Sequence, residues 1–455
     1  MKTNNSLFND FSKVSTKQWK QKIQFDLKGK DYNEHLVWES LEGIKVKPFY
    51  NSEDIVTIQN LSSPSKTWHI AQTIYAGNAE IANKKAINAL NKGAESIIFT
   101  IPSDTVHIEI LLKNISLETT IVYFDFTFLS SAYITKFIAL QKETTAGIFL
   151  NFDIINNLCK TGNWYTSLEN DFAELLTLIN KSKSITIDTT LYQNAGANTI
   201  QQLSYSLAHA NEYLNRIPEA ILPNITFTFK IAIGPNYFFE IAKIRALRIL
   251  WKTVAQAYNA NSTCHIIAIP SKRNKTLYDY NTNMLRSTTE SMSAILGGAN
   301  AVCNLPYDAI YHKSNNFGER IARNQLVILK EESYFDKTTN PADGSYYIEN
   351  ITKQISEKAL DLFKNLEKAG GFLSQLKSGA IQKKIKESAQ KEQDLFDTKK
   401  EILVGTNKYE SSLDKMKGNL EIYPFAKNKP RKSILEPIIE KRLAEVIEQK
   451  RLEDE

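Results

Sequence analysis

Cysteine is scarce in this sequence, with only three among 455 residues. Cys159, Cys264 and Cys303 are far apart and odd in number, so they predict neither a disulfide framework nor a close-spaced zinc site. Thiols used so sparingly are typical of a reducing compartment and predict a cytoplasmic protein. The first residues, Met1–Ser6, are polar and lack the apolar core of a secretory signal. No apolar run is long enough to cross a bilayer, so no membrane partner is expected.

A strong excess of one charge is missing as well. The 56 Lys and Arg residues are nearly balanced by 50 Asp and Glu residues, which leaves a formal net charge of +6. The two signs are interspersed except in short basic runs such as Lys427–Lys432, which is typical of a solvated linker. Because nucleic-acid-binding proteins cluster their basic residues, no nucleic-acid partner is expected. With 42% hydrophobic residues, the chain has enough apolar material for a large core or two domains.

Catalytic and nucleotide-binding motifs are absent too. No Gly-x-Gly-x-x-Gly turn follows a predicted strand, and no phosphate loop ends in Gly-Lys-Ser or Gly-Lys-Thr. Neither a His-x-x-x-His nor a His-Glu-x-x-His pattern is formed by the six histidines, which are His35, His69, His107, His209, His265 and His312. His209 lies in a helical run, where a satisfied core or surface histidine is the common case. His265 lies within a predicted strand and could face a barrel lumen, but a lone histidine indicates a site only weakly.

A regular alternation of β-rich and helical segments is what the sequence does have, from about residue 66 onward. The β-rich runs are Trp68–Tyr75, Ser96–Ile101, Thr119–Phe126, Gly147–Phe152, Ser184–Thr190, Ile225–Ile233, Cys264–Ile269 and Ala299–Asn304. Helical segments include Ala79–Leu90, Phe172–Ile179, Thr199–Leu214, Tyr237–Tyr258, Thr282–Leu296 and Gly318–Glu331. Nearly continuous apolarity is typical of parallel strands buried on both faces, and the helices supply the crossovers that parallel pairing needs.

Eight such units predict an α/β fold, a (β/α)8 barrel of the TIM type. The rival architecture is an open doubly wound sheet, which the missing glycine-rich turn disfavours. The expected organisation is an extended N-terminal leader over residues 1–60, the barrel over 61–370 and a helical C-terminal extension over 371–455.

Both ends of the chain are expected to pack on a surface that the repeat does not specify. The leader contains an amphipathic helix around Ser15–Leu27, which must lie against its own barrel or against another subunit. In the extension we predict helices over Ile351–Lys368 and Phe372–Gln393. A last charged helix is expected to begin at Pro437, because proline fits a first helical turn. Its apolar residues, which fall largely on one side, are Ile438, Ile439, Leu443 and Val446.

Carboxylates follow several predicted strands, at the end of the barrel where the active sites of this fold gather. They are Asp104, Asp125, Asp153 and Asp188. Asp104 is expected to cap the following helix, and Asp153 to do the same for its own. No Ser–His or Cys–His pair and no metal cluster accompanies them. We therefore predict no catalytic, cofactor-binding or metal-binding residue in this chain.

Six stretches resemble the methylmalonyl-CoA mutase family, in the order in which the family has them. They are Glu42–Tyr50, Gly234–Ala246, Leu285–Gly298, Glu319–Asn324, Asn340–Glu349 and Val404–Tyr409. The resemblance implies a barrel that encloses an acyl-CoA, in an enzyme that interconverts methylmalonyl-CoA and succinyl-CoA by radical chemistry. It also implies that a separate C-terminal domain carries adenosylcobalamin through an Asp-x-His-x-x-Gly motif.

The positions that would carry this chemistry depart from the family pattern. Thr190 and Leu191 stand where the family has Tyr and His, and a leucine side chain cannot hydrogen-bond to a thioester carbonyl. A family Gln and two family Arg residues are also missing, at Asn151, at Thr73 (two residues before the retained Tyr75) and near Lys160 or Thr161. The Arg-Thr-His run of the seventh strand is absent as well.

No Asp-x-His-x-x-Gly motif occurs, and the sequence ends where the cobalamin domain would begin, so no cobalamin-binding domain is expected. In these combined losses the chain is similar to the small subunit of heterodimeric bacterial mutases. The resemblance thus implies a non-catalytic subunit, with adenosylcobalamin bound by a large-subunit partner. One alternative is a catalytic barrel that uses a separate cobalamin-binding chain. Another is an acyl-CoA-binding or chaperone-like accessory protein.

The state of the barrel lumen follows less directly from the sequence. Thr186, Thr189 and Thr190 are small and would leave a polar channel, whereas neighbouring Phe and Ile residues would fill it. A channel that is at least partly filled is expected.

Overall fold

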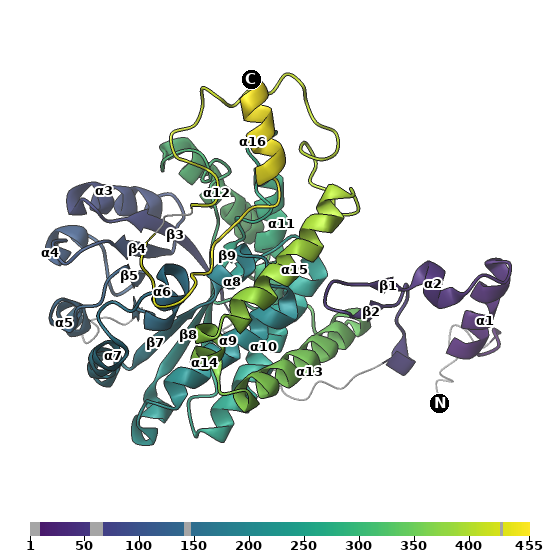
Figure 1. The fold of residues 1–455 in the computed structure, drawn as a ribbon, viewed down its shortest axis with the longest axis horizontal. Helices are drawn as coiled ribbons and strands as arrows, with labels where there is room; N and C mark the ends of the chain where they lie inside the picture. Colours follow the sequence, from purple (N-terminus) through teal and green to yellow (C-terminus); the bar gives the residue numbers. More distant parts are fainter. Residues whose placement is uncertain (1–9, 55–66, 141–146, 428–430) are drawn as a thin grey trace, which may run out of the picture.

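Eight parallel strands curve into a nearly closed barrel (Figure 1). The computed structural model describes residues 10–54, 67–140, 147–427 and 431–455. In chain order the strands are β3 (His69–Tyr75), β4 (Ser96–Ile101), β5 (Ile121–Phe126), β6 (Ile148–Asn151), β7 (Ser184–Asp188), β8 (Thr226–Ile233), β9 (Cys264–Pro270) and β10 (Ala301–Cys303). Side chains that point outward from them are buried under helices, which explains the nearly continuous apolar runs. The predicted (β/α)8 barrel is confirmed.

One seam of the barrel is built differently from the rest. Hydrogen-bonded ladders join the described strands in the order β6-β5-β4-β3-β10-β9-β8-β7, so β10 pairs with β3 while no ladder is found between β6 and β7. The two strands nevertheless lie side by side. Side chains bridge this seam, as the site described below shows.

Helices surround the barrel and connect its strands (Figure 1). They are α3 (Ala79–Leu90), α4 (Ile108–Leu111), α5 (Ser131–Leu140), α6 (Ile154–Thr161), α7 (Leu168–Ser182), α8 (Thr190–Asn194), α9 (Thr199–Leu214), α10 (Tyr237–Ala257), α11 (Thr282–Gly297) and α12 (Asn316–Val327). A π-helical turn over Ile328–Glu332 follows α12, and α13 (Tyr346–Lys368) lies across α9 and α10. None of the described helices is both long and apolar enough to span a membrane.

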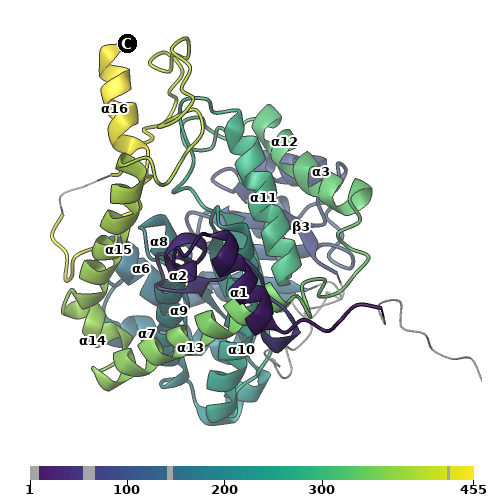
Figure 2. The same cartoon turned by 90° about the vertical axis from the view of Figure 1, so that its right-hand side faces the viewer.

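The leader stands out from the barrel as an arm in Figure 1, and Figure 2 looks onto this arm, with α1 and α2 in front of the barrel. It contains α1 (Thr16–Asp26), α2 (Tyr32–Leu36), the hairpin of β1 (Trp38–Glu39) with β2 (Lys45–Val46), and a 3-10 turn at Ser52–Asp54. The hairpin joins the arm to the barrel, since the Trp38 ring meets the Phe239 ring edge-on at 5.7 Å and Glu42 accepts the Thr199 N–H. No residue of α1 is buried.

The C-terminal extension is only partly helical. Helices α14 (Phe372–Lys377) and α15 (Ala380–Asp397) agree with the predicted helix over Phe372–Gln393, and α16 (Glu445–Asp454) ends the chain. The prediction of a helix beginning at Pro437 is wrong. Residues 431–444 instead run irregularly over the barrel rim, and we call this segment the strap. Backbone N–H groups of the strap donate to rim carbonyls instead of to their own turn, so no helix forms before Glu445.

The cap expected at Asp104 is wrong as well. Three further residues separate it from α4, which begins at Ile108 after His107, and no side chain caps that helix. Asp153 does cap α6, as predicted, by accepting the Asn156 N–H at 2.8 Å. The domain limits at residues 60 and 370 stay predictions, and the first lies outside the described residues.

Candidate functional site at the barrel mouth

A buried lysine crosses the lumen just below the mouth. Lys230 points inward from β8, and its Nζ lies 2.7 Å from Asp125 Oδ2 and 3.2 Å from Asp188 Oδ2. Asp188 is its direct neighbour in register on β7, whereas Asp125 belongs to β5 across the lumen. Two carboxylates that the sequence places at strand ends are thus joined by a lysine that sequence reasoning missed. We call these three residues the lumen triad.

The triad holds its charges in place. Burial alone would lower the pKa of Lys230, but the two carboxylates outweigh it and raise that pKa. Burial would likewise raise the pKa of Asp188, yet Lys230 and the hydrogen bonds from Thr190 lower it. The hydroxyl of Thr190 donates to Asp188 Oδ1 at 2.6 Å, and its backbone N–H donates at 3.1 Å. The polar groups at this depth are therefore already committed to one another.

Further hydrogen bonds extend the triad across the seam between β6 and β7. The Asn151 amide donates to Asp125 at 2.7 Å, and the Thr186 hydroxyl donates to Asn151 at 2.8 Å. Thr189 donates its hydroxyl to the Lys230 carbonyl at 3.0 Å. Small residues that would have left a polar channel instead complete a bonded layer.

The deeper half of the lumen is filled by rings and aliphatic side chains. His265 Nε2 lies 2.9 Å from the Tyr123 hydroxyl, and its ring stacks on Phe149 at 4.5 Å. Around them pack Ala71, Ile98, Ile267, Ala301 and Cys303. Burial lowers the pKa of His265 to about 3, so the ring is neutral at ordinary pH. His265 faces the lumen, as the sequence allowed, and helps to fill it.

Asp153 is the hub of the seam, beyond its role as a cap. Its Oδ1 accepts the Tyr213 hydroxyl at 2.6 Å and lies 3.0 Å from His209 Nε2, while Oδ2 accepts the Asp188 N–H at 2.8 Å. The other nitrogen of His209 lies 3.0 Å from the Tyr192 hydroxyl. His209 is fully buried with both ring nitrogens bonded, which makes it a satisfied core histidine.

The positions matched to family substrate and catalytic residues offer little to a ligand. Leu191 is buried beneath the strap, and Thr190 is held by Asp188. Thr73 Oγ1 lies 3.1 Å from Cys303 Sγ, while Tyr75 stands on the rim with 67% of its surface exposed. Across the described residues, no group of three or more His, Cys, Asp or Glu side chains is arranged to hold a metal ion.

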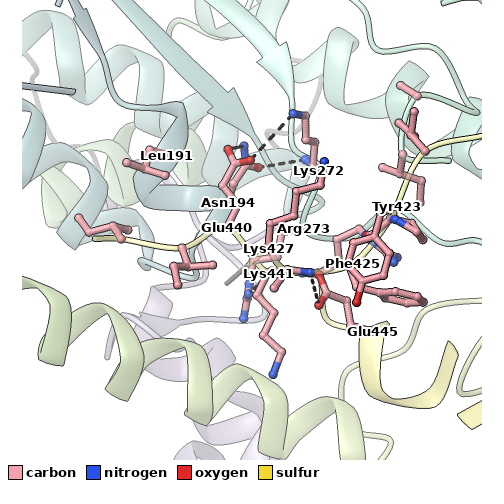
Figure 3. Close-up of a pocket in the computed structure, with 18 of the residues that line it drawn as sticks. Leu191, Asn194, Lys272, Arg273, Tyr423, Phe425, Lys427, Glu440, Lys441 and Glu445 are labelled. Carbon is pink, nitrogen blue, oxygen red and sulfur yellow. Dashed lines mark hydrogen bonds and ion pairs between the residues drawn. The ribbon is translucent and has the colours of Figure 1, made fainter. Parts of the chain in front are cut away.

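The strap lies across one side of the mouth. Its Ile438, Lys441 and Leu443 N–H groups donate to carbonyls at the starts of three connections, those of Cys159, Asn194 and Arg273, at 2.8 to 3.0 Å. The yellow chain in Figure 1 follows this path in front of α6 and α8. Between the strap, the rim and a second pass of the tail at residues 422–427 lies a pocket of about 340 Å³ (Figure 3).

Lys230 had one signal in the sequence that reasoning could have used. In β8, Thr226, Thr228 and Lys230 alternate with apolar residues, so all three share a face. A charged residue on the lumen side of a central strand requires partners of opposite charge. The strap had no comparable signal, since its burial depends on contacts with distant rim residues.

Comparison of the sequence with known proteins matches it to one family. The family described as methylmalonyl-CoA mutase matches residues 103–450. The methylmalonyl-CoA mutase small subunit of Porphyromonas gingivalis is 36% identical over 451 residues, which cover 90% of this chain and 72% of that protein. The small subunit of Propionibacterium freudenreichii subsp. shermanii is 25% identical, covering 81% of this chain and 64% of that one.

More distant matches add less. The mitochondrial methylmalonyl-CoA mutase of Bos taurus is 27% identical over 86% of this chain and 60% of its own length. Among solved structures, a dihydropteroate synthase from Coxiella burnetii aligns with 66% of this chain and 99% of its own at a TM-score of 0.30 and 12% identity, too low to carry an argument. The family match over residues 103–450 and the 36% identical small subunit show that this chain belongs to the methylmalonyl-CoA mutase family.

Proposed function

We propose that this chain is the non-catalytic small subunit of a methylmalonyl-CoA mutase. It assembles with a large subunit as a heterodimer, and the large subunit binds adenosylcobalamin and converts methylmalonyl-CoA to succinyl-CoA. The small-subunit names of its relatives support the assembly. The proposal includes a cytoplasmic location, which the three buried free cysteines support.

The filled lumen is the observation that carries the non-catalytic role. An acyl-CoA inside the barrel would have to displace the ion pairs of Lys230 with Asp125 and Asp188, and below them the Tyr123–Phe149–His265 stack. Removing one partner of a buried ion pair costs several kcal/mol, on the order of 3–5. Entry of a substrate would therefore be energetically unfavourable, and Leu191 offers no hydrogen-bond donor for the substrate's carbonyl.

The residues present do not fit a cobalamin held by this chain. The Asp-x-His-x-x-Gly motif is absent from the sequence. Of the histidines near the lumen and mouth, His209 has both nitrogens bonded and His265 lies in the deep ring stack. Neither is free to bind a metal.

The exposed apolar residues of the arm support the proposal of a protein partner. Helix α1 buries none of its residues, and Trp19 of α1 packs on Phe49 of the same leader with ring centroids 4.7 Å apart. Phe11, Val14 and Phe25 remain exposed at 73%, 67% and 78%. Apolar side chains gathered on a projecting element are typical of a protein interface.

Co-expression with the candidate large subunit tests the proposal. We expect the pair to co-purify through a tag on this chain and to convert substrate with adenosylcobalamin, whereas this chain alone does not. Replacing Leu191 with Met should leave the rate of the pair within about twofold, since the swap conserves volume. If instead this chain turns over substrate when given only a separate cobalamin-binding protein, the split-enzyme alternative holds.

The arm provides a second test of the assembly. Phe25→Glu should weaken association with the large subunit by about tenfold or more, because it places a charge in an apolar contact. Ile328→Glu is the matched control, since Ile328 is an exposed apolar residue at 45% on the barrel side. Equal association of both variants would exclude the arm from the interface.

A further inference from the structure

The pocket under the strap is separate from the lumen triad. It has a volume of about 340 Å³ and is built by rim residues on one side and by two passes of the C-terminal tail on the other. In Figure 3, Leu191 and Asn194 lie on one side and Tyr423 and Phe425 on the opposite side. The carboxyl ends of barrel strands are where this fold places its ligands.

Four lysines surround this pocket. Lys160 lies in the last turn of α6, Lys272 follows β9, and Lys427 and Lys441 belong to the tail. Lys272 forms a loose ion pair, 3.9 Å long, with Glu440, which also accepts a hydrogen bond from Asn194. Lys160, Lys427 and Lys441 form no ion pair with any described residue and are exposed. Two carboxylates also line the pocket, Glu440 beside Lys272 and Glu445, which accepts the backbone N–H groups of Ala426 and Arg442. Positive side chains therefore outnumber negative ones at the pocket.

The two arginines of the pocket stiffen its walls. Arg273 pairs with Glu392 and donates to the Lys441 carbonyl at 2.7 Å. Arg442 is buried, pairs with Glu448 at 2.6 Å and donates to the Lys275 carbonyl. Its Nη2 has no hydrogen-bond acceptor among the described residues. These bonds hold the strap, which carries Lys441, against the rim.

An aromatic wall completes the pocket. Tyr423 is 59% exposed, and its ring contacts that of Phe425 edge-on, with centroids 5.4 Å apart and planes at 78°. Ile438 and Ile439 of the strap line the same space. An exposed ring beside apolar side chains can stack a flat heterocycle.

From this combination we propose that the pocket binds a nucleotide-type anion, with its phosphoryl groups on Lys427, Lys441 and Lys160 and its base against Tyr423. Lysine ammonium groups bind phosphate as mobile point charges. The volume lies within the range of small-molecule sites. This inference goes beyond the proposed subunit role, because a non-catalytic chain needs no ligand of its own.

Calorimetric titration of the full chain with ADP, pyrophosphate and adenosine tests the site. We expect ADP to bind most tightly, pyrophosphate more weakly and adenosine not measurably, with ADP affinity falling as salt is raised. Lysine acylation read by mass spectrometry locates the site: ADP should protect Lys427 and Lys441 but not Lys364 on α13. Absence of ADP binding up to about 1 mM would overturn the proposal.

A matched pair of variants decides whether the pocket is responsible. Lys427→Glu with Lys441→Glu should weaken ADP binding by at least about tenfold. Lys364→Glu with Lys368→Glu changes the net charge equally on exposed positions of α13 and should alter it less than about twofold. Equal weakening by both pairs would indicate attraction to overall charge and overturn the site.

Discussion

Two helices of this protein begin with the same capping motif but lie in opposite surroundings. Helix α1 begins with a capping box of Ser15 and Gln18, and α9 begins with one of Asn198 and Gln201. Yet α1 buries none of its 11 residues, whereas α9 buries all of its 16 except Gln201. The same local capping motif therefore begins both helices, while packing against the barrel distinguishes α9 from α1.

The hydrogen-bond partners of the two helices differ in the same way as their burial. Polar residues of α9 are bonded by its neighbours: Ser204 donates to the Ala359 carbonyl, Asn211 donates to Glu367, and Gln202 accepts from Lys243. Helix α1 is bonded to other leader residues, for example through the bond from Asn51 to Thr16. The barrel covers α9, whereas the described residues leave α1 uncovered, as the proposed docking role of the arm requires.

The largest expected effect separates the two helices by stability. Leu207→Ala in α9 should lower the free energy of unfolding of the isolated chain by about 2–5 kcal/mol, because Leu207 is fully buried and its loss leaves a cavity. Ile23→Ala in α1 should lower it by less than about 1 kcal/mol, since Ile23 is only half-buried within the arm. Urea denaturation followed by circular dichroism measures both.

A control keeps this comparison fair. Adding the large subunit should stabilise the arm, so Ile23→Ala should then weaken the complex while Leu207→Ala still acts mainly on folding. If the two substitutions destabilise the isolated chain equally, α1 is packed by its own barrel and the contrast fails.

Sequence reasoning predicted the barrel well because periodicity records it directly. The limits expected for β4, α3 and α9 coincide with those observed. It failed at Pro437, where apolar residues such as Ile438 are buried by the rim and the pattern mimics a helical face. Apolar spacing alone does not distinguish a helix from an extended strap that is covered by other parts of the chain.

Only part of the site was predicted from the sequence. The carboxylates at the strand ends were predicted, since the fold places them at one mouth. Their partner Lys230 was not predicted, because its contact with Asp125 is made across the lumen. Leu191 was identified as unable to polarise a carbonyl, which stays a prediction, and the structure adds that it is buried at the mouth. The pocket under the strap could not be predicted, because it depends on how two irregular segments of the C-terminal tail contact the rim.

A smaller effect appears as a dependence on pH. Burial lowers the pKa of His265 from 6.5 to about 3, so between these values the unfolded chain binds a proton that the folded chain does not. Stability should therefore fall as pH drops below 6.5, by about 1–2 kcal/mol on reaching pH 5. In His265→Gln, unfolding free energies measured from pH 7 to 5 should lose this part of the slope.

Again the arm supplies the control. His35 lies exposed on α2, and His35→Gln is the matched control for the loss of a histidine outside the lumen. A slope that persists in His265→Gln, or one that disappears with His35→Gln, would assign the proton to a group outside the lumen.

The smallest effect acts on the capping boxes themselves. Asn198→Ala removes the side chain that accepts the Gln201 N–H at 3.0 Å and should lower the unfolding free energy by about 1 kcal/mol, because α9 unfolds only with the barrel. Ser15→Ala removes the equivalent cap of α1 and should leave global unfolding unchanged within about 0.3 kcal/mol, while hydrogen exchange in α1 speeds up, since an uncovered helix frays locally. A global loss of similar size in Ser15→Ala would mean that arm and barrel unfold as one unit, and the arm would then be part of the folded core and not a separate docking element.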